Sequence, residues 1–423
     1  MKVKIKPGKN NENIINIPSS KSIAHRVIIG ASLSEGVSNI SNVNYSNDII
    51  ATINCMEKLG AKITLKDDSL TVEGINLLDI NDKEIIDCNE SGSTLRFLIP
   101  IFALTNKEVI FTGSKRLMER PLNVYREIFD KQGLLFKYED DGLHIKGPLK
   151  SDNFIIDGSV SSQFITGLLY ALPLLENDST LTILEPYESE SYINLTVDAL
   201  NKFNIDLEKE NNLFYKIKGS QKYKSNDCTI EGDFSQMSFF SALGQINSIV
   251  KIDGLNVNSK QGDKAIIDII KNMNGNIEEG NIYISKPSNL IGTIVDLKDC
   301  PDLGPIVMAL ATQAKGDTHI INAGRLRIKE SDRILAMETE LKKLGCNITS
   351  SETEVFIKGK TKIKGGITLF GHNDHRIVMA LSILATIAEN EIVIEDAHAI
   401  TKSYPNFFKD LIKLGIEVEE YDI

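Results

Sequence analysis

The stretch ATINCMEKLGAKITLKDDSLTVEG (residues 51–74) combines a helical pattern with a hairpin pattern. Ile53, Met56 and Leu59 recur with helical spacing, and Gly60 follows as a residue suited to the left-handed conformation that ends many helices. The segments AKITL and SLTVEG then alternate apolar and polar residues as strands do. The stretch therefore predicts an amphipathic helix that ends at Gly60 and leads into two short strands.

The same pattern recurs five more times along the chain. A Gly or an Asn follows the helix in every copy, and successive copies are 70 to 73 residues apart. These residues are Gly60, Gly133, Asn204, Asn274, Gly345 and Gly415. The last copy stops after one strand, IEVEEY (416–421). A fixed period over the whole chain indicates structural repeats.

A second series of short polar clusters lies out of phase with the first. The clusters are Ser20-Lys21-Ser22, Ser91-Gly92-Ser93, Ser161-Ser162-Gln163, Ser235-Gln236, Asp302 and Asp374. Each opens a nearly apolar segment, such as FITGLLYALPLL (164–175), which predicts a helix buried on most sides. Each repeat of about 70 residues is thus predicted as β-α-β-α-β-β. Three repeats make a natural domain, and six make two.

Composition excludes several classes of function. The net charge of −11 argues against a general nucleic-acid binder. No run of 18 apolar residues predicts a membrane span, and the polar start of the chain predicts no signal peptide. The five cysteines are scattered without a C-x-x-C pair, so we expect reduced thiols in a cytoplasmic protein. The histidines lack the spacing of metal ligands, and no nucleotide-binding glycine motif occurs.

The polar clusters allow two interpretations. Ser, Asp and Gly at helix starts can simply cap the helix by satisfying its first N–H groups. If the repeats are parallel in space, however, the positive ends of their helix dipoles point the same way and favour an anion. Lys and Arg residues stand near nearly every one of these starts. They are Lys21, Arg26, Arg96, Arg120, Lys329, Arg333, Arg376 and Lys402.

Two acids lie among these cations, and each has an ordinary structural explanation. Asp302 follows Cys300-Pro301 at the start of a buried helix, where it could act as an N-cap. Glu330 follows Lys329 and could be an acid favoured by a helix dipole. Taken alone, each isolated Lys or Arg is more often a solvated surface charge. The recurrence of cations at equivalent positions favours a ligand with several negative charges.

Eight motifs together resemble a known family. They are PSSKSIAHR (18–26), NESGSTLR (89–96), RLMERPL (116–122), GSVSSQF (158–164), PDLGP (301–305), RIKESDR (327–333), GHNDHR (371–376) and ITKSYP (400–405). In this order, over essentially the full chain, they look like the 3-phosphoshikimate 1-carboxyvinyltransferase (EPSP synthase) family. The resemblance implies a two-domain inside-out α/β barrel with three repeats in each domain. It also implies one domain at 18–232, another at 1–17 plus 233–423, and an active site in the cleft between them.

The resemblance further implies an enzyme that transfers the enolpyruvyl group of phosphoenolpyruvate to the 5-hydroxyl of shikimate 3-phosphate. The residues implied for shikimate 3-phosphate are Lys21, Ser22, Arg26, Ser161, Ser162, Gln163, Ser189, Tyr192, Asp302 and Lys329. Those implied for phosphoenolpyruvate are Lys21, Gly92, Arg120, Gln163, Arg333, Arg376 and Lys402. Those implied for catalysis are Asp302, Lys329, Glu330, Lys21 and His375. No metal or organic cofactor, no nucleic acid and no membrane is implied, and we expect a monomer.

Three positions depart from the pattern of the family. Glu90 stands where many members have Asn, Arg325 where some have Asn, and Phe97 where some have Pro. The family's inhibitor glyphosate competes with phosphoenolpyruvate. Gly92 leaves the backbone open to it, which predicts sensitivity, whereas Phe97 favours resistance.

Three alternatives remain on the same type of repeat. UDP-N-acetylglucosamine enolpyruvyl transferases share the repeats and the donor, but they carry a reactive Cys before an Arg-Pro pair. No Cys lies near Arg120-Pro121 in this chain. A non-catalytic binder of anionic metabolites would not need Asp302, Lys329 and Glu330. RNA 3′-phosphate cyclases would consume a nucleotide.

Overall fold

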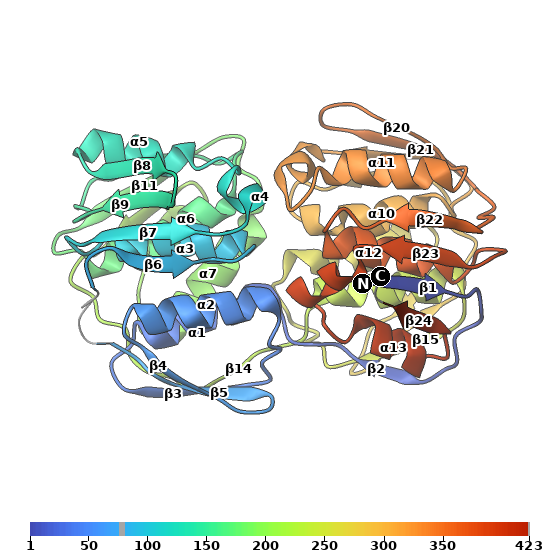
Figure 1. Cartoon of the computed structure of the whole chain (residues 1–423), viewed down its shortest axis with the longest axis horizontal. Helices are drawn as coiled ribbons and strands as arrows, with labels where there is room; N and C mark the ends of the chain where they lie inside the picture. Colours follow the sequence, from blue (N-terminus) through green and yellow to red (C-terminus); the bar gives the residue numbers. More distant parts are fainter. Residues whose placement is uncertain (76–80, 422–423) are drawn as a thin grey trace. The chain divides into compact units, whose positions relative to one another are not determined.

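The chain folds into two compact units. The computed structural model describes residues 1–75 and 81–421. Residues Lys21–Ile230 form the central unit, and Met1–Ser20 with Glu231–Ile423 form the terminal unit. In Figure 1 the central unit runs from blue to green, and the terminal unit runs from yellow to red with the N-terminal strand in dark blue. The two-domain α/β class predicted from the sequence is confirmed.

One repeat of the central unit shows the plan of all six. It consists of β6 (Glu84–Asp87), α3 (Gly92–Phe102), β7 (Glu108–Thr112), α4 (Lys115–Met118), α5 (Asn123–Gln132), β8 (Leu135–Glu139) and β9 (Gly142–Lys146). Its sheet has the order β6-β7-β9-β8. Strands β6 and β7 are parallel because α3 connects them, and β9 pairs antiparallel with β7 and β8.

The other two repeats of the central unit follow this plan. One contains α1 (Lys21–Ser32), β3 (Val37–Ser41), α2 (Asn47–Lys58), β4 (Lys62–Leu65), β5 (Ser69–Glu73) and the distant β14 (Cys228–Thr229). The other contains β10 (Asn153–Asp157), α6 (Ser162–Ala171), η1 (Leu172–Leu174), β11 (Ser179–Leu184), α7 (Glu190–Lys202), β12 (Glu208–Asn211) and β13 (Phe214–Ile217). Their sheets have the orders β14-β3-β5-β4 and β10-β11-β13-β12.

The terminal unit contains three further repeats. The first has β2 (Ile14–Asn16), α8 (Phe234–Ile246), β15 (Val250–Asp253), η2 (Gly262–Ala265), α9 (Ile266–Asn272), β16 (Asn276–Glu278) and β17 (Tyr283–Lys286). The second has β18 (Ile294–Asp296), η3 (Pro301–Leu303), α10 (Gly304–Ala311), β19 (Gly316–Ile321), η4 (Gly324–Ile328), α11 (Arg333–Lys343), β20 (Asn347–Ser350) and β21 (Val355–Gly359). The third has β22 (Ile367–Phe370), α12 (His375–Ala385), β23 (Ile392–Glu395), η5 (Ala397–Lys402), α13 (Phe407–Lys413), β24 (Val418–Tyr421) and β1 (Lys2–Ile5).

Strands from distant parts of the sequence complete three of the sheets. β1 lies between β23 and β24, with Val3 opposite Ile394 and Glu420. It therefore supplies the strand that the last sequence repeat lacks. β2 pairs parallel with β15, and β14 pairs parallel with β3, so each takes the place of a first strand in its repeat.

The residues predicted to end the amphipathic helices have the expected conformation. All six have positive φ values, between 61° and 113°. They are Gly60, Gly133, Asn204, Asn274, Gly345 and Gly415. Only Gly adopts this region without steric cost, and Asn is among the residues that tolerate it best. The prediction of six repeats from these residues is thus confirmed.

The helices that follow the polar clusters are buried inside each unit, and the sheets lie outside them. All residues of α12 are buried, and in α3 only Ser93 is not. Strands such as β10 instead alternate buried and exposed residues, so one face of each sheet meets the core. Each unit has its own hydrophobic core. Full burial of each large aliphatic side chain contributes about 1.5–3 kcal/mol.

The two segments at which the chain passes between the units lie side by side. Ser19 and Gly232 form an antiparallel bridge, and the Ser20 N–H donates to the carbonyl of Glu231 at 2.8 Å. The Asp233 N–H donates to the carbonyl of Pro18 at 2.9 Å. These bonds fix the chain directly before α1 and α8 begin.

Candidate active site

The predicted polar clusters all lie at helix starts. Lys21, Gly92, Ser162 and His375 are the first residues of α1, α3, α6 and α12. In four cases a side chain caps the helix by accepting a backbone N–H bond. The capping residues are Ser91, Ser161, Asp233 and Asp374. The capping interpretation is confirmed for Ser91, Ser161 and Asp374. In α8 the cap is Asp233, which precedes the predicted cluster Ser235-Gln236.

Asp302 has a different environment. It is not the N-cap residue of η3 or of α10. Its carboxylate accepts hydrogen bonds from Lys329 Nζ at 3.2 Å, Arg333 Nη1 at 3.0 Å and Arg376 Nη2 at 2.9 Å. Arg376 Nη1 also donates to the main-chain carbonyl of Asp302 at 3.2 Å. Asp302 is therefore a point at which three cations converge.

Arg333 links this carboxylate to two others. Its side chain is 1% exposed, and its Nε donates to Asp374 Oδ2 at 2.8 Å while its Nη2 donates to Glu330 Oε2 at 2.7 Å. Burial by itself would lower the pKa of Arg333, but Asp374, Glu330 and Asp302 together hold that pKa above its ordinary value. The guanidinium thus stays charged and fixes the relative positions of the three acids.

For Lys329, burial has a larger effect on the pKa than the neighbouring carboxylates have. Burial lowers the pKa of the Lys329 ammonium to about 8, although Asp302 opposes that shift. The positive charges of Arg325 and Arg333 lower it further. A lysine with a pKa near the working pH can both donate and accept a proton, which is a property of catalytic lysines.

His375 and Lys402 lie next to this network. His375 is 1% exposed, and its Nδ1 lies 3.9 Å from Asp374 Oδ1. Lys402 is 5% exposed and donates to the carbonyl of Asn373 at 2.5 Å. The terminal unit therefore brings its predicted site residues together: Asp302 binds three of the cations, Arg333 links it to Glu330 and Asp374, and Lys402 binds the residue before Asp374.

In the central unit, Gly92, Arg120 and Gln163 come together around Arg96. Arg96 Nη1 donates to Gln163 Oε1 at 2.8 Å, and Gln163 Nε2 donates to Ser93 Oγ at 3.0 Å. A Cβ atom placed on Gly92 would lie 2.5 Å from Nη1 of Arg120 and 3.1 Å from Nη1 of Arg96. The absence of a side chain at Gly92 is what lets both guanidinium groups approach the start of α3.

The packing of α6 against α3 makes this meeting possible. A Cβ atom on Gly167 would lie 2.5 Å from the carbonyl oxygen of Arg96, so Gly167 allows the two helices to approach closely. The Tyr125 hydroxyl donates to the carbonyl of Arg96 at 2.6 Å and contacts the carbonyl of Phe164 at 3.1 Å. These contacts hold the starts of α3 and α6 next to each other.

Lys21 and Arg26 begin α1 in very different surroundings. Lys21 Nζ donates to Asp48 Oδ2 at 2.7 Å. Arg26 is 3% exposed, and burial lowers its pKa to about 10. Its guanidinium donates to Thr196 Oγ1 at 2.9 Å and to the carbonyl of Tyr192 at 3.0 Å. In this structure Arg26 ties α1 to α7.

The remaining predicted residues of the central unit lie near these groups. The carbonyl of Ser22 accepts from Arg26 Nη1 at 2.7 Å. Ser162 is buried at the start of α6. Ser189 directly precedes α7, is 1% exposed and has a φ of 57°. The first two turns of α1, α6 and α7 and the residues just before them therefore carry the central-unit residues predicted for shikimate 3-phosphate, whereas Asp302 and Lys329 lie in the terminal unit.

The sequence of this chain also matches a family of known proteins. The family model described as EPSP synthase (3-phosphoshikimate 1-carboxyvinyltransferase) matches residues 5–411. The chain belongs to the EPSP synthase family.

Relatives named 3-phosphoshikimate 1-carboxyvinyltransferase match this EPSP synthase family member over its whole length. The relative from Clostridium novyi is 46% identical, and the alignment covers 100% of this chain and 99% of the relative. The relative from Clostridium kluyveri is 45% identical with the same coverage. The relative from Clostridioides difficile is 43% identical, again over 100% of this chain and 99% of the relative.

Solved structures support the fold. EPSP synthase from Acinetobacter baumannii superposes with a TM-score of 0.81 at 24% identity, covering 99% of this chain and 100% of that chain. The enolpyruvyl transferase NikO from Streptomyces tendae gives a TM-score of 0.81 at 16% identity, covering 99% of this chain and 98% of that one. The same architecture is thus shared by EPSP synthases and another enolpyruvyl transferase.

Sequence reasoning missed several partners in this EPSP synthase family site. Asp374 was assigned only as a helix start, although it also binds Arg333. Asp48 has no predicted function, and Arg96 is predicted only as one of the cations near the helix starts, yet they contact Lys21 and Gln163. Asp263 is 5% exposed, and burial together with the nearby charge of Asp302 raises its pKa to about 7. Only Asp374 and Arg96 lie in recognisable motifs, so no local signal pointed to the other two.

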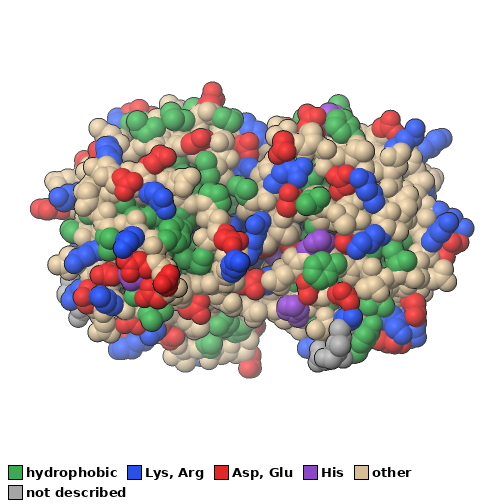
Figure 2. Space-filling model, turned by 45° about the horizontal axis from the view of Figure 1, so that its top comes forward, with side chains coloured by type: hydrophobic (Ala, Val, Ile, Leu, Met, Phe, Trp, Pro, Cys, Tyr) green, Lys and Arg blue, Asp and Glu red, His purple; other side chains and the backbone are tan. Residues whose placement is uncertain are grey.

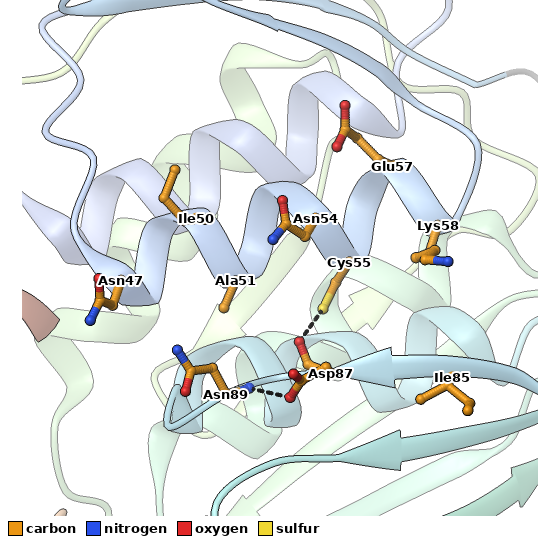
Figure 3. Close-up of a pocket in the computed structure, with 10 residues that line it drawn as sticks. All are labelled: Asn47, Ile50, Ala51, Asn54, Cys55, Glu57, Lys58, Ile85, Asp87 and Asn89. Atoms are coloured by element: carbon orange, nitrogen blue, oxygen red, sulfur yellow. Dashed lines mark hydrogen bonds between the residues drawn. The ribbon is translucent and has the colours of Figure 1, made fainter.

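A hollow of about 540 Å³ opens between α2 and the end of β6 (Figure 3). Its lining includes Asn54 and Lys58 from α2 and Asn89 from the loop before α3. The Cys55 thiol, on the same helix, donates to the carbonyl of Asp87 at 3.4 Å. None of the lining residues is a predicted substrate or catalytic residue. We therefore do not assign the substrates to this hollow.

Two general expectations can be compared with the described residues. Across residues 1–75 and 81–421, no helix has the length and apolar character needed to cross a bilayer. One group in this part of the chain could offer three ligand atoms to a metal ion, namely Glu139, Asp141 and His144. It lies on β8, on β9 and between them, and it includes none of the predicted site residues.

Proposed function

We propose that this chain transfers the enolpyruvyl group of phosphoenolpyruvate to the 5-hydroxyl of shikimate 3-phosphate, releasing phosphate and 5-enolpyruvylshikimate 3-phosphate. Full-length relatives at 43–46% identity bear the name of this activity. The observation that carries the proposal is the environment of Asp302. Its carboxylate is surrounded by Lys329, Arg333 and Arg376, in an arrangement that capping does not require.

The cations are assigned to the two anionic substrates. Binding of phosphoenolpyruvate is proposed for Lys21, Gly92, Arg120, Gln163, Arg333, Arg376 and Lys402. Binding of shikimate 3-phosphate is proposed for Lys21, Ser22, Arg26, Ser161, Ser162, Gln163, Ser189, Tyr192, Asp302 and Lys329. Bringing two anions together costs electrostatic energy and entropy, and positioned cations reduce both costs.

The proposed mechanism is addition followed by elimination. The 5-hydroxyl attacks C2 of phosphoenolpyruvate while C3 gains a proton, and a tetrahedral ketal phosphate forms. Loss of a C3 proton and of phosphate then yields the enol ether. Asp302 is the proposed base at the hydroxyl, with Lys329 beside it. Glu330 or Lys21 is proposed to transfer the proton at C3.

We propose that Asp302 becomes available as a base when Arg376 exchanges it for a substrate anion. In this structure Arg376 donates to Asp302, and a substrate carboxylate or phosphate offers the same two-oxygen acceptor to a guanidinium. A substrate anion that replaces Asp302 as the partner of Arg376 would leave an Asp302 oxygen able to accept the hydroxyl proton. His375 lies beside Asp374, which holds Arg333, so we assign it a position next to this exchange.

The test is phosphate release from phosphoenolpyruvate with shikimate 3-phosphate as acceptor. Turnover with shikimate 3-phosphate and none with UDP-N-acetylglucosamine is expected. Turnover with only the sugar nucleotide would replace the proposal by the other enolpyruvyl transferase activity. Saturable binding of both anions without turnover would indicate a binding protein. We also propose a cytoplasmic monomer that needs no metal or cofactor. Light scattering on the protein as it elutes from a size-exclusion column tests the monomer. An assay in the presence of EDTA tests whether a metal is needed.

A further inference from the structure

The terminal unit has a second concentration of positive charge, in a hollow apart from the residues around Asp302. The hollow measures about 640 Å³ and lies where α11 ends and where the chain runs from β21 into β22. Five of its eleven lining residues are lysines, namely Lys343, Lys358, Lys360, Lys362 and Lys364. The other six are uncharged. We call this site the lysine hollow.

The sequence explains why the lysines gather there. Four of them alternate with other residues in KGKTKIKGG (358–366), and all four are exposed, whereas Ile363 between them is buried. Ile363 is 2% exposed and anchors the segment to the core. Gly365 and Gly366, with φ values of 67° and 71°, then turn the chain into β22. A buried anchor and a glycine turn thus hold the lysines around one hollow.

This local charge contrasts with the rest of the molecule. The chain has a net charge of −11, and on the face shown in Figure 2 basic and acidic side chains are interspersed. In the lysine hollow, Lys343 binds Glu340 and Lys362 binds Glu389. Among the described residues, none forms an ion pair with Lys358, Lys360 or Lys364. Like charges held close together repel one another, and a bound anion removes that cost.

We propose that the lysine hollow binds a small anion with several phosphate groups. Ammonium groups act as point charges that suit phosphate oxygens, and several of them around one hollow favour an anion with three or more charges. The volume lies within the range of about 300–1,000 Å³ typical of sites for small molecules. A concave site of this size suits an oligophosphate better than an extended polyanion.

Three of the lysines are suited to mutation. Lys343 donates to both carboxylate oxygens of the buried Glu340 at 2.8 Å, and Glu340 also accepts the Phe370 N–H at 3.0 Å. Replacing Lys343 would therefore disturb the fold. Lys358, Lys360 and Lys364 are exposed, so their replacement by Gln changes charge with little effect on packing.

The experiment measures binding of inorganic tripolyphosphate to the full chain by titration calorimetry. The test variant carries Lys358→Gln, Lys360→Gln and Lys364→Gln. The matched control carries Lys→Gln at three other exposed lysines, and it has the same net charge. These three are Lys66, Lys218 and Lys298. Any binding at the proposed substrate site is common to all three proteins, so the comparison isolates the lysine hollow.

We expect the test variant to bind tripolyphosphate about tenfold more weakly than wild type, and the control to bind like wild type. Binding to wild type should also weaken with salt, because charges near the surface are screened. Equal affinity in the test variant and wild type, or an equal loss in the control, would overturn the proposal. A single-stranded oligonucleotide that binds more tightly than tripolyphosphate through the same lysines would overturn the assignment to a small anion.

Discussion

A methyl group added at Gly92 would test whether the start of α3 and Arg120 together bind phosphoenolpyruvate. The backbone of Gly92 does not have a positive φ, so alanine is permitted there by conformation and any effect must come from space. The new Cβ atom would lie 2.5 Å from Nη1 and 3.0 Å from Cζ of Arg120, and 3.1 Å from Nη1 of Arg96. At least the Arg120 guanidinium must therefore move.

The size of the movement sets the expected effect. Non-bonded carbon and nitrogen atoms rest about 3.5 Å apart, so the guanidinium must move by roughly 1 Å. The atoms in the way are the ends of flexible side chains, so the fold should tolerate the change within about 1 kcal/mol. A displacement of roughly 1 Å in a group that positions a substrate can cost about 10²-fold in rate. We therefore expect kcat/KM for phosphoenolpyruvate to fall about 10- to 100-fold, mostly through KM.

The assay is phosphate release at varied phosphoenolpyruvate and at varied shikimate 3-phosphate, with thermal unfolding measured alongside. Gly280→Ala is the matched control, because the nearest atom to its new Cβ, the carbonyl oxygen of Ile282, lies 3.5 Å away. The KM for shikimate 3-phosphate should change little in either variant. An unchanged KM for phosphoenolpyruvate in Gly92→Ala would refute the reasoning, because the clash with Arg120 would then have no functional consequence.

Glyphosate provides a second measurement on the same variant. The resemblance to the family implies that it competes with phosphoenolpyruvate, so we expect competitive inhibition of wild type and much weaker inhibition of Gly92→Ala. Phe97 complicates this expectation, because its ring packs against His25 and lies 5.1 Å from the Arg26 guanidinium. These contacts tie α3 to α1 and could change the position of its start. Wild type that resists glyphosate as strongly as Gly92→Ala would refute the expectation of sensitivity while leaving the proposed reaction intact.

Three further predictions concern charged groups. Asp302→Asn keeps the size of the side chain but removes the proposed base, so kcat should fall at least about 10²-fold; turnover near wild type would exclude Asp302 as the base. Burial lowers the pKa of Lys329 to about 8, so activity that needs its ammonium form should decline above pH 8. Lys329→Arg should move this decline to higher pH, because a guanidinium keeps its charge. Profiles of rate against pH that decline at the same pH in both proteins would contradict this prediction. Hydrogen bonds to Asp141 and Glu108 raise the pKa of His144 above its ordinary value of 6.5. These bonds therefore stabilise the folded chain fully below pH 6.5, and the stabilisation is lost as the pH rises through the raised pKa of His144. Urea unfolding should show His144→Gln less stable than wild type by about 1 kcal/mol at pH 6, with a smaller difference at pH 9; a difference that does not depend on pH would argue against a charged His144.

The repeat could be predicted from the sequence because its signals are local. A helix end at Gly133 or Asn274 needs a left-handed residue, and that need is met by one amino acid at one position. The apolar run after each polar cluster likewise reports the burial of its own helix. Such signals survive in a single sequence because they do not depend on which distant segment packs against them.

The pairing of strands that are distant in the sequence could not be predicted in this way. β1 completes a sheet with β23, about 390 residues away in the sequence, and with β24, about 415 residues away, and β14 pairs with β3. Nothing within Lys2–Ile5 or Cys228–Thr229 identifies the partner strand, because a strand of four or two residues is too short to specify which sheet it joins. The resemblance to a family implied that the N-terminal strand joins the terminal repeats, whereas the period of the repeats could not.

Local sequence also could not identify the distant partners of the site residues, most clearly those of Asp302. Its position before a buried helix made an N-cap the simplest local explanation, and the structure instead places it among three cations. The largely buried network pairs Lys329, Arg333 and Arg376 with Asp302, Glu330 and Asp374, so a carboxylate balances each of these three cations. Burying an unpaired charge costs several kcal/mol, and this balance lets the cations stay in place before a substrate arrives. An anionic substrate can then replace a carboxylate rather than enter an empty cationic site. In the proposed mechanism Asp302 and Glu330 would thus have two functions, since they stabilise the cations without substrate and would be released toward proton transfer when the substrate binds.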